Sequence, residues 1–478
     1  MSTSISTSGS VSSAGIGSGL DVTSIIAKLM TVEQAPLTLL QNKQSALKTT
    51  ISTYGSVRSA VSGFRDAALS LTNTSTWSAT TGTSSDPTAI TVSTSASAPA
   101  GSYAIVVQNL AAAQSTVSTT FAAGTDLVGA GTLHVDIGTW SAGQAGFTAK
   151  TGNAGIDIIA TDTDTLATLS DKINAAGAGV AASIVTDTTG ARLVLSSSTT
   201  GSANGFRVTA SGAAGLSGLA FDPPGSGGAS ITQSGANANA TINGLAVNSA
   251  TNNLDGVLQG LTVNLTKASP TPVQVTVAQD TKSIKAAITS FVAAYNSLSS
   301  LLATDVKYDA GSKTAGPLQG DSTAVSLQRQ MRNIVGTSST ASTAFSTLSQ
   351  AGLQLQSDGT IKINDSTLTN AISNPVQIKA LFNATNVTDP GNSGFAQRFR
   401  TLGDSVLGSD GLLTSRVAGL NKSLTLNLAD QDRLNIRLAA TEARLRATYT
   451  ALDTKMASIS TLSTYVTQQI ANWNKSTG

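Results

Sequence analysis

Hydrophobic residues recur every seven positions along the last part of the chain, from about residue 412 to residue 473. A seven-residue period places one stripe along a helix, and a stripe kept over several heptads is typical of a coiled coil. After Leu424 and a polar interruption at Gln431, this stripe continues through Leu438, Leu445, Leu452, Ile459 and Val466. The expected second stripe is half polar and runs through Leu428, Asn435, Glu442, Tyr449, Met456, Ser463 and Ile470. Other helices must cover such a seam.

The opposite end of the chain carries a second seven-residue stripe, formed by Leu40, Leu47, Tyr54, Val61 and Ala68. Before it, Asp21 occupies an N-cap position, where its carboxylate can accept from a free backbone N–H. Leu20 and Ile25 occupy the two positions of a hydrophobic staple, and Pro36 breaks the helix or restarts it. Each end of the chain is therefore expected to form a helix with an apolar stripe. This pattern predicts that the two termini pack together and hold the middle of the chain between them.

The middle of the chain shows short alternating runs, which predict strands. Strands are expected at residues 89–92, 103–107, 133–137, 156–159, 180–185, 192–195, 241–247, 261–265 and 273–277, with a helix at 166–175. The helical period returns at Asp280, which is expected to cap the next helix. Further helices are expected near residues 321–335, 375–382 and 395–406, with a hairpin turning at Asp358-Gly359. The pattern predicts an α+β multidomain chain with helical flanks.

Charge separates the middle from the flanks. Residues 66–266 contain four basic residues and eleven aspartates, a net charge of −7, whereas the two flanks together have a net charge of +9. The 478 residues are 40% hydrophobic and 11% charged, which supports several cores and lacks the charge-rich signature of disorder. The middle and the flanks are therefore expected to form different layers of the structure.

Few residues are available for catalysis or metal binding. The chain has no cysteine, which excludes disulfides and thiolate sites, and His134 is its single histidine. No apolar run reaches 18 residues, and the first residues lack the basic segment and apolar core of a secretory signal. We therefore expect no catalytic residue, no cofactor, no metal ion, no nucleic-acid partner and no membrane insertion. Any export is expected to proceed without a cleaved signal peptide.

Two motifs resemble binding loops, but their context argues against that interpretation. The glycines at positions 15, 17 and 19 follow no predicted strand, so a phosphate-binding loop is not favoured. The Asp162 and Asp164 pair lacks the spaced glycine and the final glutamate of a calcium loop, and helix capping is the favoured role. His134 lies within a strand pattern and is expected to be hydrogen-bonded or on the surface.

The opening stretch reads GIGSGLDVTSIIAKLMTVEQAPLTLL and is followed by STYGSVRSAVSGF. Later segments are GSYAIVVQNLAAAQ, INGLAVN, LDGVLQGLTVNLT, DTKSIKAAITSFVAAYNSL, LQGDSTAVSLQRQMR and GLLTSRVAGLNKSLTLNLADQDRLNIRLAATEARLRATYTALD. Over nearly the whole length and in this order, the chain resembles the flagellar filament-capping proteins of the hook-associated protein 2 family. The segment TLATLSDKINAAGAGVAASIVTDTTGARLVLSSSTTGSANGF resembles a module that caps share with some flagellins.

The resemblance implies a domain map with terminal coiled-coil leg helices, a helical-bundle domain and two inserted β-rich head domains. The leg region would comprise residues 1–44 and 406–478, and the helical domain residues 45–74 and 278–405. The first head domain would comprise residues 75–112 and 230–277, and the second, flagellin-like one residues 113–229. Leg packing and filament contact would then involve Leu20, Asp21, Ile25, Leu40, Leu47, Tyr54, Val61, Leu438, Leu445, Leu452, Ile459 and Val466.

The resemblance also implies a function without an enzymatic step. Family members form a homo-oligomeric ring at the distal tip of the bacterial flagellum, and the resemblance implies a ring of about five copies for this chain. The ring retains exported flagellin and promotes its folding and its insertion into the filament. The implied partners are flagellin, the hook–filament junction proteins, the flagellar export chaperone and the type III export apparatus. The implied location is secreted and extracellular.

Two alternatives belong to other classes of function. An enzyme acting on surface glycans would use paired carboxylates from the Asp-rich middle, but nothing in the sequence pairs them. A surface adhesin would bind host mucus or glycans through the acidic, Ser/Thr-rich head domains. Loss of the gene separates these hypotheses, because a missing cap shortens or abolishes filaments, whereas a missing adhesin leaves them intact.

Overall fold

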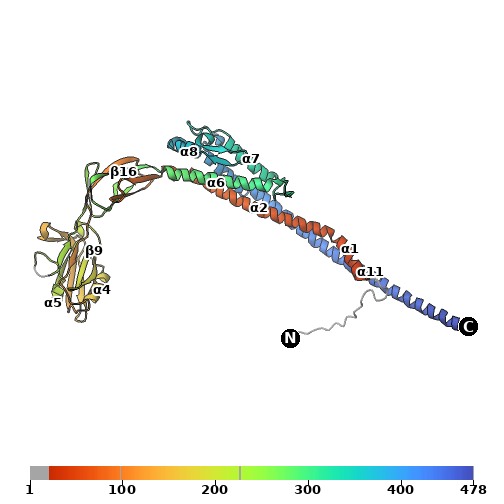
Figure 1. Ribbon diagram of the computed structural model, residues 1–478, viewed down its shortest axis with the longest axis horizontal. Coiled ribbons are helices and arrows are strands. Elements are labelled where there is room, and N and C mark those ends of the chain that lie inside the picture. The colour runs from red at the N-terminus through yellow and green to blue at the C-terminus, as the bar shows by residue number, and fades with distance from the viewer. Residues whose placement is uncertain (1–20, 97, 226–227, 477–478) are drawn as a thin grey trace. The chain divides into compact units, whose positions relative to one another are not determined.

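The computed structural model describes residues 21–476 except residues 97, 226 and 227 (Figure 1). The chain divides into two compact units. The first unit is mainly helical and combines Met1–Asn73 with Lys285–Gly478, and the second is Thr74–Ile284, in which strands predominate. The α+β multidomain fold class expected from the sequence is confirmed.

The helical unit contains α1 (Val22–Glu33), α2 (Ala35–Thr72), α6 (Thr281–Val306), α7 (Ser322–Gly336), α8 (Asp365–Ile372), α9 (Pro375–Asn383), α10 (Phe395–Leu407) and α11 (Leu412–Ser476). Two short hairpins join them, β17 (Tyr308–Asp309) with β18 (Thr314–Ala315), and β19 (Leu353–Leu355) with β20 (Ile361–Ile363). Pro36 lies in the first turn of α2, so the predicted restart is confirmed. Asp321 caps α7, accepting from the backbone N–H groups of Thr323 and Ala324.

An aromatic cluster forms the centre of the helical unit. Phe64 from α2, Phe291 and Tyr295 from α6, and Phe399 from α10 are all completely buried. The Phe64 ring lies 5.0 Å from that of Phe399 and 5.3 Å from that of Phe291, centroid to centroid. Tilted and edge-on rings at such distances stabilise a core beyond the area that they bury. The cluster therefore holds the second half of α2 against α6 and α10, two helices that come later in the sequence.

Within the residues that the structure describes, one helix, α6, is long and apolar enough to cross a membrane by length and composition alone. The apolar side chains along α6 are buried inside the protein. Ile284, Ile288, Phe291, Tyr295, Leu298 and Leu302 are at most 1% exposed. This apolar face is therefore that of a core helix, and it accounts for the high hydropathy.

The β-rich unit contains two separate hydrophobic cores. One forms between a five-stranded sheet, in the order β1-β16-β3-β12-β13, and a three-stranded sheet, β14-β15-β2. The bounds of these strands are β1 (Thr80–Ser84), β2 (Ile90–Thr94), β3 (Gly101–Asn109), β12 (Ala238–Ile242), β13 (Leu245–Ser249), β14 (Asn253–Leu258), β15 (Leu261–Leu265) and β16 (Ser269–Gln279). A short helix, α3 (Thr74–Ser78), precedes β1.

The second core belongs to the segment inserted between β3 and β12. One sheet has the order β10-β5-β6 with β7 also paired to β5, and the other has the order β11-β4-β9-β8. The bounds are β4 (Ser115–Val117), β5 (Gly131–Trp140), β6 (Phe147–Ala149), β7 (Ile156–Ala160), β8 (Val180–Asp187), β9 (Gly190–Ser197), β10 (Gly205–Gly212) and β11 (Ser230–Gln233). Helices α4 (Leu166–Ala176) and α5 (Ala214–Ser217) pack beside these strands.

One predicted strand was wrong. The alternating run at residues 241–247 is a hairpin, in which β12 ends at Ile242 and β13 begins at Leu245. Asn243 and Gly244 form its two-residue turn with φ values of 50° and 82°. Asn-Gly is the preferred pair for such a turn because both residues tolerate positive φ. The signal was in the sequence, but the apolar residues on both sides masked it.

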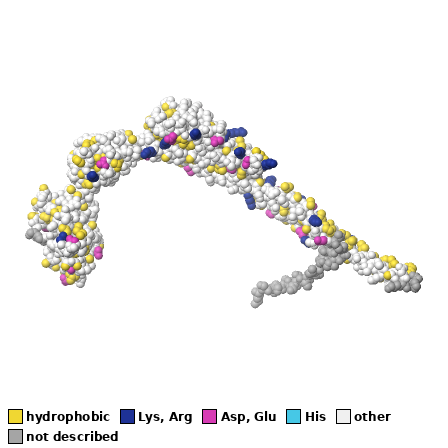
Figure 2. Space-filling view, in the orientation of Figure 1, with side chains coloured by type: hydrophobic (Ala, Val, Ile, Leu, Met, Phe, Trp, Pro, Cys, Tyr) yellow, Lys and Arg dark blue, Asp and Glu magenta, His cyan; other side chains and the backbone are white. Residues whose placement is uncertain are grey.

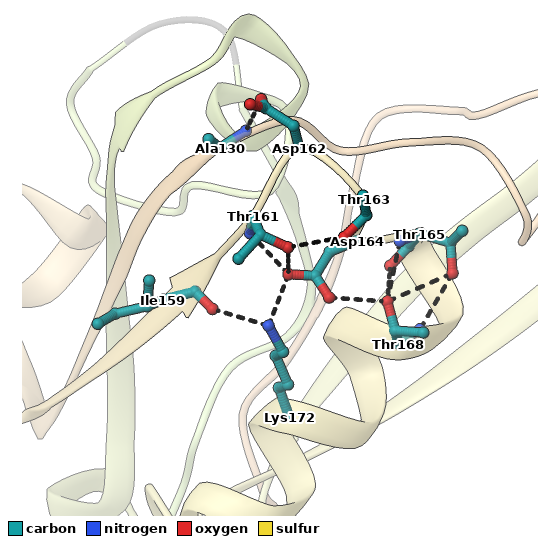
Figure 3. A network of polar contacts seen from close by, with 9 residues as sticks. All are labelled: Ala130, Ile159, Thr161, Asp162, Thr163, Asp164, Thr165, Thr168 and Lys172. Atoms are coloured by element: carbon teal, nitrogen blue, oxygen red, sulfur yellow. Dashed lines mark hydrogen bonds and ion pairs between the residues drawn. The ribbon is translucent and has the colours of Figure 1, made fainter.

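The capping role expected of Asp162 and Asp164 was also wrong. Thr165 is the N-cap of α4, and its hydroxyl accepts from the backbone N–H of Thr168. Asp164 instead accepts from the Lys172 ammonium (2.6 Å) and from Thr161, as Figure 3 shows. The adjacent ammonium holds the pKa of Asp164 well below its usual value. The Lys172 ammonium thus neutralises the Asp164 carboxylate, in a loop whose sequence resembles a cation site.

His134 on β5 is hydrogen-bonded, as expected. Its Nδ1 lies 2.6 Å from an Asp157 oxygen, and its Nε2 lies 3.1 Å from an Asp136 oxygen. The hydrogen bond with Asp157 raises the pKa of the imidazole. Arg207 donates to the other oxygen of Asp136 at 2.7 Å. The single histidine of the chain is therefore part of a charged cluster that links β5, β7 and β10.

The β-rich unit is expected to fold without the rest of the chain, because both of its cores are built from its own residues. β1 also pairs with β16, which joins the beginning and the end of the unit. A fragment spanning residues 74–284 should be soluble, rich in strand by circular dichroism and cooperative on heating. A fragment that is unfolded by circular dichroism would show that the two cores need the helical unit.

Candidate docking site on the leg helices

The legs, defined here as α1, the first half of α2 and α11, pack through a short apolar contact. Val22, Ile26 and Met30 of α1 are buried against Leu434 and Leu438 of α11. Leu37, Leu40, Leu445 and Tyr449 are half-buried around this cluster. Asp21 caps α1 as predicted and accepts from the Ser24 N–H at 2.9 Å. The contact therefore ends near residue 449, far short of the end of α11.

The helices α2 and α11 run antiparallel. Gln431 of α11 contacts Leu40 and Gln44 early in α2, whereas Arg416, earlier in α11, approaches Tyr54 later in α2. The buried side of α11 in this part of the pair carries Leu413, Leu420, Asn427 and Leu434 beside the predicted stripe. The second stripe expected from the sequence was wrong, because its first members do not face α2: Leu428 is 40% exposed, and Asn435 is also exposed. A polar residue at position 427 hid the actual column.

A charged cluster joins α2 and α11 to α7 within the helical unit. Asp321 accepts from the Tyr54 hydroxyl at 2.7 Å through one oxygen, and from the Arg416 guanidinium at 2.7 and 3.0 Å through the other. Burial opposes ionisation of Asp321, but hydrogen bonds from Tyr54 and Arg416 outweigh it and keep its pKa below the usual value. Burial and the contact with Asp321 raise the pKa of Tyr54. One carboxylate thus holds α2, α7 and α11 together.

The far part of α11 presents an exposed apolar stripe. Every described side chain from residue 458 to residue 474 is exposed, so the described part of the chain does not cover this segment. The stripe, called the distal stripe below, comprises Leu452, Met456, Ile459, Leu462, Val466 and Ile470, which are 40% to 60% exposed. Figure 2 shows hydrophobic side chains along this end of the helix. Large apolar residues lined up on one exposed helix face mark an interaction site.

The charge of α11 changes at the point where its internal contacts end. Nine charged residues lie between positions 412 and 446, but only Asp453 and Lys455 lie between positions 447 and 474. Solvent-facing helices normally carry many charges, which keep their surfaces soluble. A segment that is both exposed and almost uncharged is therefore suited to a partner that covers it.

The twelve predicted site residues differ in their surroundings. Leu20 lies outside the described residues, and Asp21 caps α1. Ile25, Leu40, Leu47 and Leu445 are half-buried, and Leu438 is buried. Tyr54 and Val61 are buried in the second half of α2. Leu452, Ile459 and Val466 belong to the distal stripe.

Sequence reasoning missed three residues that matter for the packing of α11. Arg416 and Asn427 gave no periodic signal, and Asp321 was named only as the start of a helix. Within the described residues, no group of three His, Asp or Glu side chains is placed to hold a metal ion.

The chain thus combines a mainly helical unit, whose longest helix carries an exposed apolar stripe, with a β-rich unit that has two cores of its own. Three family models match the chain. The N-terminal model of flagellar hook-associated protein 2 matches residues 18–114, its C-terminal model matches residues 235–461, and the flagellin hook IN motif matches residues 146–199.

Relatives and a solved structure agree with these matches. Flagellar hook-associated protein 2 of Escherichia coli strain K12 is 32% identical over 475 residues, which cover 97% of this chain and 98% of the relative. That of Salmonella typhimurium is 31% identical over 477 residues, covering 98% and 100%. The crystal structure of the flagellar cap protein FliD D1-D2-D3 domains from Escherichia coli gives a TM-score of 0.58 at 28% identity, covering 77% of this chain and 99% of that one. The chain belongs to the flagellar hook-associated protein 2 family, the cap proteins of the flagellar filament.

Proposed function

We propose that this protein assembles into an oligomeric cap at the distal, extracellular end of the filament. There it retains exported flagellin and promotes its folding and insertion. Self-association into a ring of about five copies is part of the proposal, as are contacts with flagellin and the hook–filament junction proteins. Passage through the flagellar export apparatus with an export chaperone, without a cleaved signal peptide, is a further part. No match points to adhesion.

The distal stripe is the observation that carries this proposal. A structural cap needs a surface that docks on the filament end without chemical reaction, and the stripe is apolar, exposed and almost uncharged. We assign it to helical segments of flagellin at the filament end, because apolar helix faces pair with one another through interlocking side chains. The flagellin hook IN motif at residues 146–199 adds a module related by name to flagellin.

Gene deletion with complementation tests the proposed function. A strain that lacks this protein should form short or absent filaments, and it should release flagellin into the medium. The full-length chain should restore filaments and swimming. The fragment 74–284 should not restore them, because it lacks the helical unit, to which the legs belong. Normal filaments in the deletion strain would contradict a capping role, and rescue by the fragment would show that the legs are dispensable.

A further inference from the structure

Three amide side chains meet at one level of the α2–α11 pair. Gln431 Nε2 lies 2.7 Å from Asn427 Oδ1, 3.3 Å from Gln44 Oε1 and 3.5 Å from the backbone oxygen of Leu40. Asn427 is 2% exposed and Gln431 is 9% exposed. We call Gln44, Asn427 and Gln431 the amide layer.

The seam on both sides of the amide layer is apolar. Leu413 and Leu420 precede the layer on α11, Leu434 and Leu438 follow it, and all four are buried. On α2, Leu40 and Leu47 flank Gln44 and are half-buried. The amide layer is therefore a single polar level in an otherwise hydrophobic contact, with amides contributed by both helices.

The amide layer makes the α2–α11 pair less stable than it would be with leucines at the same three positions. The Asn427 amide nitrogen is buried and has no hydrogen-bond partner. A buried donor without an acceptor keeps its full desolvation penalty. The advantage of the amide layer must therefore be something other than stability.

Register is the property that the amide layer controls. A slip of one heptad moves one helix along the other by about 10 Å, given a rise of about 1.5 Å per residue. After such a slip, leucines of α11 would face Gln44, and leucines of α2 would face Asn427 and Gln431. Gln431 would lose its contacts with Gln44 and Leu40, and Gln44 would lose Gln431, whereas the hydrogen bond between Gln431 and Asn427 lies within α11 and would persist. Leucine against leucine, in contrast, costs little in any register. A polar residue in a coiled-coil core is known to specify register at a cost in stability.

We propose that the amide layer fixes the register of α2 against α11 and gives up stability to do so. The register determines how far α11 extends beyond its contact with α1, and hence where the distal stripe lies. The register assignment depends only on the geometry of the pair, and its consequence for capping rests on the proposed function.

Spin labels measure the register directly, and the absence of native cysteine makes the labelling specific. Cysteines replace Lys48 on α2 and Arg437 on α11, which are both exposed. Because the helices are antiparallel, Lys48 and Arg437 lie at different positions along the axis of the pair. A slip of one helix along the other therefore changes the distance between the two labels. The full-length protein with its amide layer should give one narrow distance distribution. The variant Q44L/N427L/Q431L should give an additional population, displaced by up to about 10 Å.

Two further variants control for packing changes. Leu434→Met replaces one apolar seam residue by another of similar volume and should keep the single distribution. Moving the layer by one heptad, with I51Q/L420N/L424Q added to the triple leucine variant, should restore a single distribution. A triple leucine variant with one unchanged distribution would overturn the proposal, as would a relocated layer that leaves the register mixed.

Thermal unfolding and swimming provide independent readouts. The triple leucine variant should melt higher than the parent by at least about 2–4 °C, whereas Gln44→Leu alone should melt lower, because it removes one partner of Gln431. A triple leucine variant that melts lower than the parent would contradict the stated cost. In cells, a mixed register with normal swimming would leave the register assignment intact and refute its link to capping.

Discussion

Replacing Asp321 with alanine is expected to destabilise the helical unit by about 3 kcal/mol. The substitution removes the N-cap of α7, which is typically worth about 1 kcal/mol. It also leaves the completely buried Tyr54 hydroxyl without its acceptor, which costs about 1–3 kcal/mol. The lost pair with Arg416 adds less, because that side chain is 41% exposed. Loss of the helical circular dichroism signal in urea measures the change.

Matched variants separate the contributions. Tyr54→Phe keeps the ring and removes only the hydroxyl, so it should cost about 1 kcal/mol. Asp365→Ala breaks the exposed ion pair between Lys285 and Asp365 in the same unit and should cost less than about 1 kcal/mol. If D321A unfolded at the same urea concentration as the parent protein, the charged cluster would not hold the three helices together.

The stabilisation by Asp321 depends on pH in a defined direction. Its folded-state pKa is lowered, so its contribution is present above the unfolded-state pKa and is lost as pH falls through the folded-state value. The difference in stability between the parent protein and D321A should therefore be large at neutral pH and should shrink in acid. An unchanged difference in acid would show that the charge of Asp321 contributes little.

Local signals in the sequence were sufficient for most of the helices. Asp21 and Asp280 each precede an apolar helical period, and each caps a helix as expected. These predictions succeed because capping joins atoms only two or three residues apart. The stripe from Leu438 onward follows from the heptad period alone, although its exposed end is visible only in the structure.

Contacts between distant residues were not predictable in the same way. Tyr54 and Asp321 are 267 positions apart, and nothing near either residue indicates the other. Similarly, the side-chain amide of Asn174 on α4 forms hydrogen bonds with both the N–H and the C=O of Ala182 on β8. The amide of Asn296 on α6 does the same with Ile361 on β20. An amide that pairs with a strand in this way depends on tertiary placement rather than on local pattern. The same reason explains why Asn427, a buried seam residue, was missing from both predicted stripes.

The distal stripe allows the strongest test of docking by the legs. Leu452→Asp or Ile459→Asp should abolish swimming and release flagellin into the medium, because docking would bury an unpaired carboxylate at a cost of several kcal/mol. A loss of about 3 kcal/mol corresponds to binding weakened by about 100-fold. The fold should be unaffected, since Leu452 and Ile459 are 44% and 60% exposed. Circular dichroism and thermal unfolding of the purified variants verify this.

Thr461→Asp is the matched control for charge, because residue 461 lies two positions after residue 459 and so faces away from the stripe at about 100° per residue. It introduces the same carboxylate on the same segment and should leave swimming unchanged. Loss of swimming in all three variants would mean that a partner covers the whole circumference of the helix. Normal swimming with both stripe variants would exclude the distal stripe as the surface that docks on the filament. If the stripe instead pairs two copies of this chain, the stripe variants should change the oligomeric state of the purified protein before any flagellin is added.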